Sequence, residues 1–181
     1  MKFHKQKIPG VWIIEAEPFT DHRGRFRRHY CQKEYEKHGL ETNIVQTNIS
    51  ENKMKHTLRG FHFQKKPYGE CKTFSCLQGS VYDIVVDLRP GSETFLKWIS
   101  LKLKGEDFLS LHIPHGCANA FLTQEDSTTM LYYASEYYRP EFESGVRYND
   151  PTFNFEWPVE PSVISEKDKS FPNLDPHSAD L

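Results

Sequence analysis

Short β-branched runs between turn residues constrain the fold of this chain most. Ser80–Leu88 is rich in valine and isoleucine and is followed by Pro90 and Gly91, while Trp98–Leu103 alternates apolar and polar side chains. Alternation with a period of two is typical of a strand that buries one face. Comparable runs occupy residues 11–14, 58–64, 108–113 and 128–133. Strands spaced by about 8–12 residues predict an all-β sandwich or barrel.

The rest of the chain predicts one helix and no second domain. Gln32–His38 has helical character and stops at Gly39, a residue that is common just beyond helix ends. The last thirty residues show little periodicity, so we expect them to wrap the barrel as loops and short helices. The chain has 181 residues with neither repeats nor a linker, which predicts a single domain spanning 1–181.

Charge and cysteine content exclude several classes of function. The 23 basic and 25 acidic residues nearly balance, which argues against nucleic acid or an anionic membrane as a partner. No apolar run approaches the ~20 residues of a membrane-spanning helix, and Met1–Lys7 lacks the hydrophobic stretch of a secretory signal. We therefore expect a cytoplasmic protein whose four cysteines are reduced thiols. A local cluster of four arginines between residues 23 and 28 could still bind a phosphorylated small molecule.

His62 is the first candidate for catalysis. In a strand over residues 58–64, its side chain shares a face with Gly60 and Gln64, between aromatic neighbours that point the other way. If that face lines the interior of a barrel, the imidazole is partly desolvated, which favours the neutral form that acts as a base. The alternative is a core histidine whose ring is satisfied by a backbone carbonyl, and for a lone histidine that is the commoner case.

Three other residue types could complete a proton-transfer site. Lys72 lies in an apolar stretch, and an inward lysine can stabilise a developing enolate. One of the four tyrosines between residues 132 and 138 can act as a proton donor. A carboxylate in the segment 164–169 could return to the barrel and orient an imidazole. The alternatives are an exposed strand lysine, aromatic packing and solvated charges in the tail.

The histidine pattern predicts no metal centre. Gln64 stands where the second ligand of a His-x-His pair would follow His62, and His112 and His115 flank Pro114 at a spacing that is not typical of a strand site. No glutamate near them in the sequence completes a set of ligands, and neither a glycine-rich phosphate loop nor a serine nucleophile elbow is visible. We expect neither a metal nor another cofactor.

Seven segments, spread in order over nearly the whole chain, form a recognisable set. They are residues 19–26, 46–50, 58–64, 79–89, 113–118, 148–151 with Trp157 and Pro158, and 164–168. Together they resemble the dTDP-4-dehydrorhamnose 3,5-epimerase family. The resemblance implies an all-β, cupin-type jelly-roll barrel with short peripheral helices and a loop-rich C-terminal tail. It also implies a nucleotide-sugar substrate, a cofactor-independent epimerisation next to a 4-keto group, and a homodimer that exchanges strands at its interface.

The resemblance also implies roles for individual residues. His62 matches the base of the family, Asp168 the carboxylate that pairs with it, and Tyr132 the tyrosine that reprotonates the opposite face of the sugar. Lys72 matches the lysine beside the 4-oxygen. The candidates for substrate binding are Arg23, Phe26, Arg28, Gln46, Asn48, Arg59, Asn119 and Tyr138. Arg23 is expected to serve the site of the neighbouring subunit.

Two positions depart from the family pattern. Asn119 stands where the family has a histidine, and an amide cannot carry a titrating proton, so inversion of C3, of C5 or of both stays open. Arg28 stands where the family usually has an acidic residue near the nucleotide. A thymidine nucleotide is the first choice, with CDP- and GDP-linked sugars as alternatives.

Two functions of other classes also stay open. A metal-dependent cupin oxygenase would contain a stoichiometric metal that its activity requires. A non-catalytic sugar-nucleotide binding protein could use the same barrel, because one fold hosts unrelated functions. Such a binder has no need for His62, Lys72, Tyr132 and Asp168 together, and this favours the epimerase.

Overall fold

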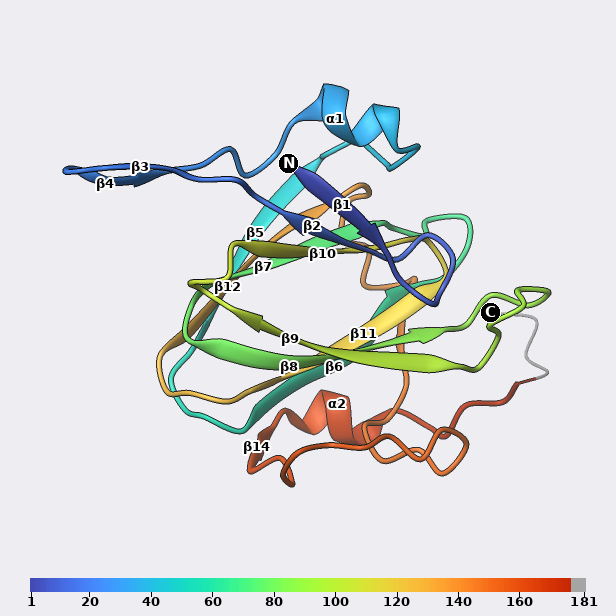
Figure 1. Cartoon of the computed structure of the whole chain (residues 1–181). Coiled ribbons are helices and arrows are strands. Elements are labelled where there is room, and N and C mark those ends of the chain that lie inside the picture. The colour runs from blue at the N-terminus through green and yellow to red at the C-terminus, as the bar shows by residue number, and fades with distance from the viewer. Residues whose placement is uncertain (177–181) are drawn as a thin grey trace.

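Two β-sheets packed face to face form the body of the protein (Figure 1), in a computed structural model that describes residues 1–176. The first sheet has the order β1-β2-β10-β7-β12-β5: Lys2–Lys5, Trp12–Glu15, Leu109–Ile113, Lys72–Gln78, Thr128–Ala134 and Gln46–Asn52. The second has the order β13-β6-β11-β8-β9: Glu143–Gly145, Thr57–Gln64, Cys117–Thr123, Ser80–Asp87 and Trp98–Lys104. The last five residues of the expected domain, 177–181, lie outside the described part.

The pairing within the two sheets is that of a jelly roll. Every neighbouring pair along the two orders is antiparallel, and the short strand β14 (Val163–Ile164) adds a parallel pairing at β6. The predicted all-β architecture is therefore confirmed. No helix within residues 1–176 combines the length and apolar character needed to cross a lipid bilayer.

Burial on both faces explains the continuous apolar run in β8. Val81 and Val85 pack between the sheets, in a cluster that includes Leu111 and Phe121. Ile84 and neighbouring side chains pack instead on the outer face of the second sheet, where the C-terminal segment covers them (Figure 1). A fully buried aliphatic side chain stabilises the fold by about 1.5–3 kcal/mol, so this double coverage anchors the tail.

The two helices lie on opposite sides of the body (Figure 1). α1 (Gln32–Lys37) covers the first sheet through the buried ring of Tyr35, and the chain leaves it at Gly39, whose φ is +69°. α2 (Glu166–Ser170) lies in the C-terminal segment under the second sheet. The predicted helix and the predicted short helix in the tail are both confirmed.

A hairpin projects away from both sheets. Its strands β3 (Phe19–Asp21) and β4 (Gly24–Phe26) pair only with each other and extend beyond the body (Figure 1). The side chains of Phe19 and Phe26 are 79% and 74% exposed. Large apolar rings this exposed mark a surface that another molecule can cover.

Candidate active site

A bulge in β6 sets which side chains face the space between the sheets. Across from it on β11, Asn119 pairs with His62 and Ala120 pairs with Gly60, so Phe61 is an extra residue. Gly60 has a φ of +114°, and a Cβ there would collide with the Asn119 carbonyl and with Ala120. Only glycine fits this position. The extra residue turns Arg59 to the same side as His62, where both line a cavity of about 170 Å³.

His62 and Asp168 form a tightly held pair. The Nε2 atom of His62 lies 2.8 Å from Oδ1 of Asp168, and the other carboxylate oxygen accepts the backbone N–H of Gly60 at 3.2 Å. Because a carboxylate only accepts, the hydrogen of the neutral ring sits on Nε2 and leaves Nδ1 as the basic nitrogen. The sequence alternative of a histidine satisfied by a backbone carbonyl is thus not what the structure shows.

Helix α2 places the carboxylate in this pair. Ser165 is the N-cap residue, and its hydroxyl accepts the backbone N–H of Asp168 at 3.1 Å. The Asp168 side chain is only 5% exposed, against 32% for His62. Burial raises the pKa of Asp168, but the hydrogen bonds from His62 and Gly60 outweigh burial, so the net shift of that pKa is downward. Asp168 is therefore ionised at neutral pH.

Lys72 and Tyr132 face His62 from the opposite sheet. They lie on the neighbouring strands β7 and β12, where Lys72 pairs with Ala134 and Tyr132 with Phe74. The two side chains are thus diagonal neighbours on one face. His62, Lys72 and Tyr132 border both the cavity beside Arg59 and a second one of about 340 Å³.

An acidic side chain holds Lys72, and an apolar ring covers Tyr132. The Lys72 ammonium lies 2.8 Å from the carboxylate of Glu70, and both side chains are largely buried. The Tyr132 ring stacks on Phe74 with the ring centroids 4.9 Å apart. Burial raises the pKa of Tyr132, which keeps its hydroxyl protonated as a proton donor.

The larger cavity has a polar wall made by three of the predicted substrate-binding residues. Gln46, Asn48 and Tyr138 line it. Gln46 accepts the backbone N–H of Tyr138 through Oε1 at 2.5 Å, and the Tyr138 hydroxyl donates to Glu143 at 2.5 Å. Burial raises the pKa of Glu143, but bonds from Lys167 and Tyr138 outweigh this and lower it overall. The cavity thus presents both hydrogen-bond donors and hydrogen-bond acceptors to a polar ligand.

Asn119 lies over a buried acid. Its amide nitrogen donates to Asp83 at 3.1 Å, and both residues come from the second sheet. Burial raises the pKa of Asp83 well above its usual range, and the bond from Asn119 offsets this only in part. A neutral acid is the form that an amide partner can satisfy without an uncompensated buried charge.

The structure also supplies residues that the sequence analysis missed. Glu70 and Glu143 enter the site as partners of Lys72 and Tyr138, and no pattern in the sequence marks them. Asp83 did carry a signal, because it is an acidic residue inside the apolar run of β8. Charged side chains are almost never fully buried without a role or a partner.

Three of the predicted substrate-binding residues do not line either cavity within one chain. Arg23 and Phe26 lie on the projecting hairpin, where Arg23 pairs with Asp21. Arg28 pairs with Glu34 at 3.0 Å. Because the hairpin projects away from the body (Figure 1), Arg23 and Phe26 lie apart from both cavities of their own chain.

The cysteines offer no reactive thiol to this site. Cys31, Cys71, Cys76 and Cys117 are all unpaired, as expected. Burial raises the pKa values of Cys71 and Cys117 to about 12 and that of Cys76 to about 11. A thiol with so high a pKa is a poor nucleophile at neutral pH. The chemistry of the cavity therefore belongs to an imidazole with its carboxylate, an ammonium and a phenol, the set that general acid–base catalysis uses.

Comparisons with known proteins agree on one family. The family model described as dTDP-4-dehydrorhamnose 3,5-epimerase matches residues 5–176. The chain is 37% identical to the dTDP-4-dehydrorhamnose 3,5-epimerase of Methanothermobacter thermautotrophicus, over 96% of this chain and 94% of that protein. It is also similar to the crystal structure of the Bacillus anthracis enzyme of that name with TDP and pyrophosphate bound, with a TM-score of 0.93, 35% identity and coverage of 96% and 99%.

One solved relative carries a different activity in its name. A 3'-monoepimerase from Streptomyces bikiniensis, in complex with dTDP-quinovose, has a TM-score of 0.88 and 31% identity, with coverage of 94% of this chain and 86% of that one. Likeness of the fold alone therefore does not separate inversion of one carbon from inversion of two.

Proposed function

Because this chain belongs to the dTDP-4-dehydrorhamnose 3,5-epimerase family, we propose that it is an isomerase acting on a nucleotide-linked 4-keto-6-deoxyhexose. The best-supported reaction converts dTDP-4-dehydro-6-deoxyglucose to dTDP-4-dehydrorhamnose. The observation that carries the proposal is the placement of His62 on one sheet, with Lys72 and Tyr132 facing it from the other across a shared cavity.

His62 is proposed to remove the proton from the carbon next to the ketone. Asp168 holds the hydrogen on Nε2, so that Nδ1 is the atom that accepts the proton. Asp168 then lies beside the imidazolium that forms and stabilises its charge. A general base placed in this way contributes roughly 10²–10⁴-fold to the rate.

Lys72 and Tyr132 are proposed to complete the reaction from the opposite side. When the proton leaves, negative charge moves onto the 4-oxygen, and an ammonium held by Glu70 can stabilise that enolate. One such group contributes about 2.7–4 kcal/mol to transition-state stabilisation. Tyr132 then donates its proton to the carbon from the face opposite His62, which inverts the centre. These steps need only residues of this chain.

The number of carbons inverted is proposed to depend on Asn119. Its amide faces the cavity beside Arg59 and is bonded to Asp83, so it can bind a sugar hydroxyl but cannot relay a proton. We therefore propose inversion at one or both of C3 and C5, with Asn119→His as the variant that tests the difference.

We also propose an oligomeric state, a cellular compartment, a domain extent and a nucleotide preference. The exposed aromatic rings on the β3–β4 hairpin support a homodimer in which that hairpin crosses to the second copy. The four unpaired thiols are consistent with a reducing compartment such as the cytoplasm. The family match to residues 5–176 supports one domain over 1–181. Dependence on thymidine rather than cytidine or guanosine remains a proposal for direct binding measurements.

Proton exchange measured in heavy water tests the proposed function. The protein is incubated with dTDP-4-keto-6-deoxyglucose in D₂O, and deuterium at C3 and C5 is followed by NMR. We expect uptake at one or both carbons with the unaltered protein and none with His62→Ala. Uptake that survives in His62→Ala would refute the role of His62, and absence of uptake with dTDP-, CDP- and GDP-linked ketosugars alike would refute the epimerase.

A further inference from the structure

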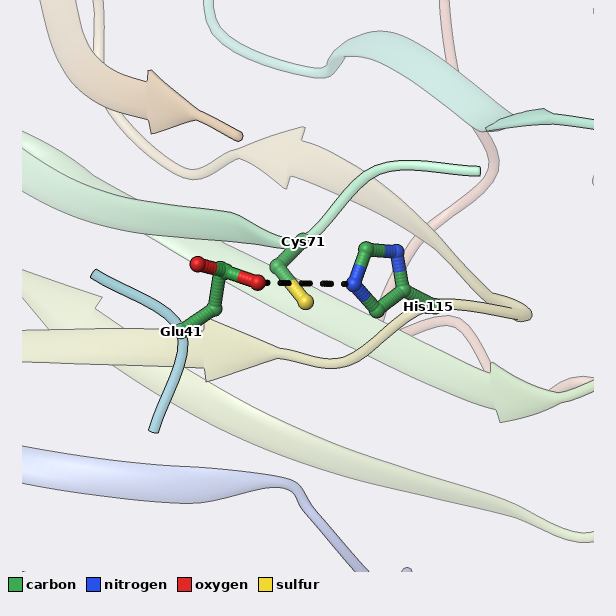
Figure 2. A group of neighbouring side chains, drawn as sticks. All are labelled: Glu41, Cys71 and His115. Carbon is green, nitrogen blue, oxygen red and sulfur yellow. Dashed lines mark ion pairs between the residues drawn. The ribbon is translucent and has the colours of Figure 1, made fainter. Parts of the chain in front are cut away.

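Three potential metal ligands meet away from the active-site cavity. Glu41 follows α1, Cys71 directly precedes β7, and His115 lies in the turn between β10 and β11. Each offers one ligand atom, and these atoms all lie within 4.8 Å of one another. Figure 2 shows the three side chains converging, with the Cys71 sulfur beside the line that joins Glu41 to His115. The Nε2 atom of His115 lies 3.8 Å from Oε2 of Glu41.

Hydrogen bonds hold two of the three ligands in place. Oε1 of Glu41 accepts the backbone N–H groups of Thr42 and Asn43 at 2.9 and 2.8 Å, which leaves Oε2 directed at His115. The backbone N–H of Cys71 donates to the Ser135 hydroxyl, and its carbonyl accepts the Ser135 N–H. Asn43 also donates to the Ser135 carbonyl. Preorganisation of this kind lowers the cost of closing ligands around an ion.

The donor set and its spacing fit zinc. A tetrahedral zinc ion binds sulfur at about 2.3 Å and nitrogen or oxygen at about 2.0–2.2 Å, so its ligand atoms lie roughly 3.3–3.8 Å apart. The distance of 3.8 Å between His115 Nε2 and Glu41 Oε2 lies at the upper end of this range, and the other pairs of ligand atoms lie within 4.8 Å, so the ligands would draw together around an ion. The side chains of His115 and Glu41 are 54% and 34% exposed, which lets them move inward and lets an ion enter. A bound divalent cation displaces the proton of the Cys71 thiol, and the resulting thiolate and the Glu41 carboxylate together balance the charge of the cation.

We propose that Glu41, Cys71 and His115 bind one zinc ion through Oε2, Sγ and Nε2, with water as the fourth ligand. This site is separate from the catalytic cavity, because Lys72 faces that cavity while none of the three ligands lines it. The ion would join the α1–β5 connection, the start of β7 and the β10–β11 turn. The bound state would therefore be more resistant to unfolding.

No sequence motif marks this cluster, because its three members are far apart in the chain and the only histidine close to His115 in sequence is His112. The folding of the chain brings Glu41 and Cys71 next to His115. A metal found in purified protein would accordingly not by itself favour an oxygenase, since it can occupy this site rather than the cavity.

Cobalt titration of the untagged, chelator-treated protein tests the proposal. Co²⁺ replaces zinc in such sites and gives an intense thiolate-to-cobalt charge-transfer band. We expect one equivalent of Co²⁺ to produce this band. Added zinc should displace the cobalt and remove the band, and zinc should raise the melting temperature of the protein. Cys71→Ser should remove the band, whereas Cys31→Ser, which changes the partly exposed thiol beside α1, should leave it unchanged.

Two further variants keep the test decisive if Cys71→Ser does not fold. His115→Ala removes a mostly exposed ring, and Glu41→Gln keeps an acceptor for the Thr42 and Asn43 N–H groups while removing the charge. Each should weaken Co²⁺ binding by more than the roughly 10–100-fold that loss of a supporting contact costs. Absence of the thiolate band in the unaltered protein would overturn the proposal, and so would an unchanged Co²⁺ affinity in both variants. Either result holds whatever the outcome of the epimerase assay.

Discussion

Replacing Asp168 by asparagine should disable the base without altering the shape of the site. The two carboxylate oxygens accept from different donors, Nε2–H of His62 and N–H of Gly60. An amide has only one oxygen, so it can accept from only one of them. If its oxygen faces Gly60, its NH₂ group faces His62 and forces the ring proton onto Nδ1. If its oxygen faces His62, the Gly60 N–H meets another donor.

Both orientations have a cost that can be put in numbers. The first removes the basic nitrogen, and loss of a placed base lowers turnover by about 10²–10⁴-fold, equivalent to roughly 2.7–5.4 kcal/mol in the activation free energy. The second leaves a buried donor unsatisfied, which costs about 1–3 kcal/mol of folding free energy, so the first orientation, which satisfies both contacts, is the one that is populated. Because Asp168 acts on substrate only through His62, we expect Asp168→Asn to lower kcat far more than it changes KM.

The assay compares kcat and KM of Asp168→Asn with those of Glu166→Gln. Glu166 lies on the same helix but its side chain is 91% exposed, so its substitution should leave both constants unchanged. A folded Asp168→Asn protein that turns over within about tenfold of the unaltered enzyme would refute the argument.

The lowered pKa of Asp168 adds a dependence of stability on pH. A carboxylate whose pKa is lower in the folded state stabilises the fold above its unfolded-state pKa, near 3.9, and loses this contribution as pH falls through the folded value. The difference in unfolding free energy between the unaltered protein and Asp168→Asn should therefore be full at neutral pH and narrow below about pH 4. Urea unfolding at a series of pH values measures it.

Three further predictions follow from the same geometry. Tyr132→Phe should lower product formation by roughly 10²–10⁴-fold while deuterium exchange at the carbon facing His62 continues, and loss of both together would contradict separate acid and base roles. Gly60→Ala should destabilise the fold by more than about 1–3 kcal/mol, since a Cβ there collides with backbone. Gly39→Ala, also at positive φ but in open space, should cost about 1 kcal/mol. Equal losses of unfolding free energy in urea denaturation would count against the packing argument. The pKa of Asp83 is raised in the folded state, so its stabilising contribution is present below the unfolded-state pKa near 3.9 and is lost as pH rises. Asp83→Asn should therefore become more stable relative to the unaltered protein from pH 4 to 8. A difference in unfolding free energy that does not change with pH would exclude a neutral Asp83.

Part of the fold was readable from the chain alone. Regular alternation in Trp98–Leu103 and the dense β-branched run at Ser80–Leu88 gave β9 and β8 nearly to their ends. The polar strand β5 and the fully buried β11 were not predicted. β5 alternates between intermediate and exposed positions until its buried last residue, Asn52, and β11 is buried at every position, so neither has the half-apolar pattern by which a strand is found.

The site divides in a similar way. His62, Lys72, Tyr132 and Asp168 were singled out from residue types and the family resemblance, and the structure brings His62 to Asp168 across 106 positions of sequence. Their catalytic roles stay predictions until the variants are measured. Strict alternation along β6 would have put Arg59 on the face opposite His62, and the bulge at Phe61 reverses this.

The sequence by itself determined the class of fold, the family and the chemical character of the groups available, because periodicity and residue type are local properties. Only the tertiary structure decided which of these groups come together: Asp83 with Asn119, Glu41 with Cys71 and His115, and Arg59 with His62 at one cavity. These contacts depend on strand order, on register and on a single extra residue in β6. Such features arise from packing between segments far apart in the chain, which no local pattern records.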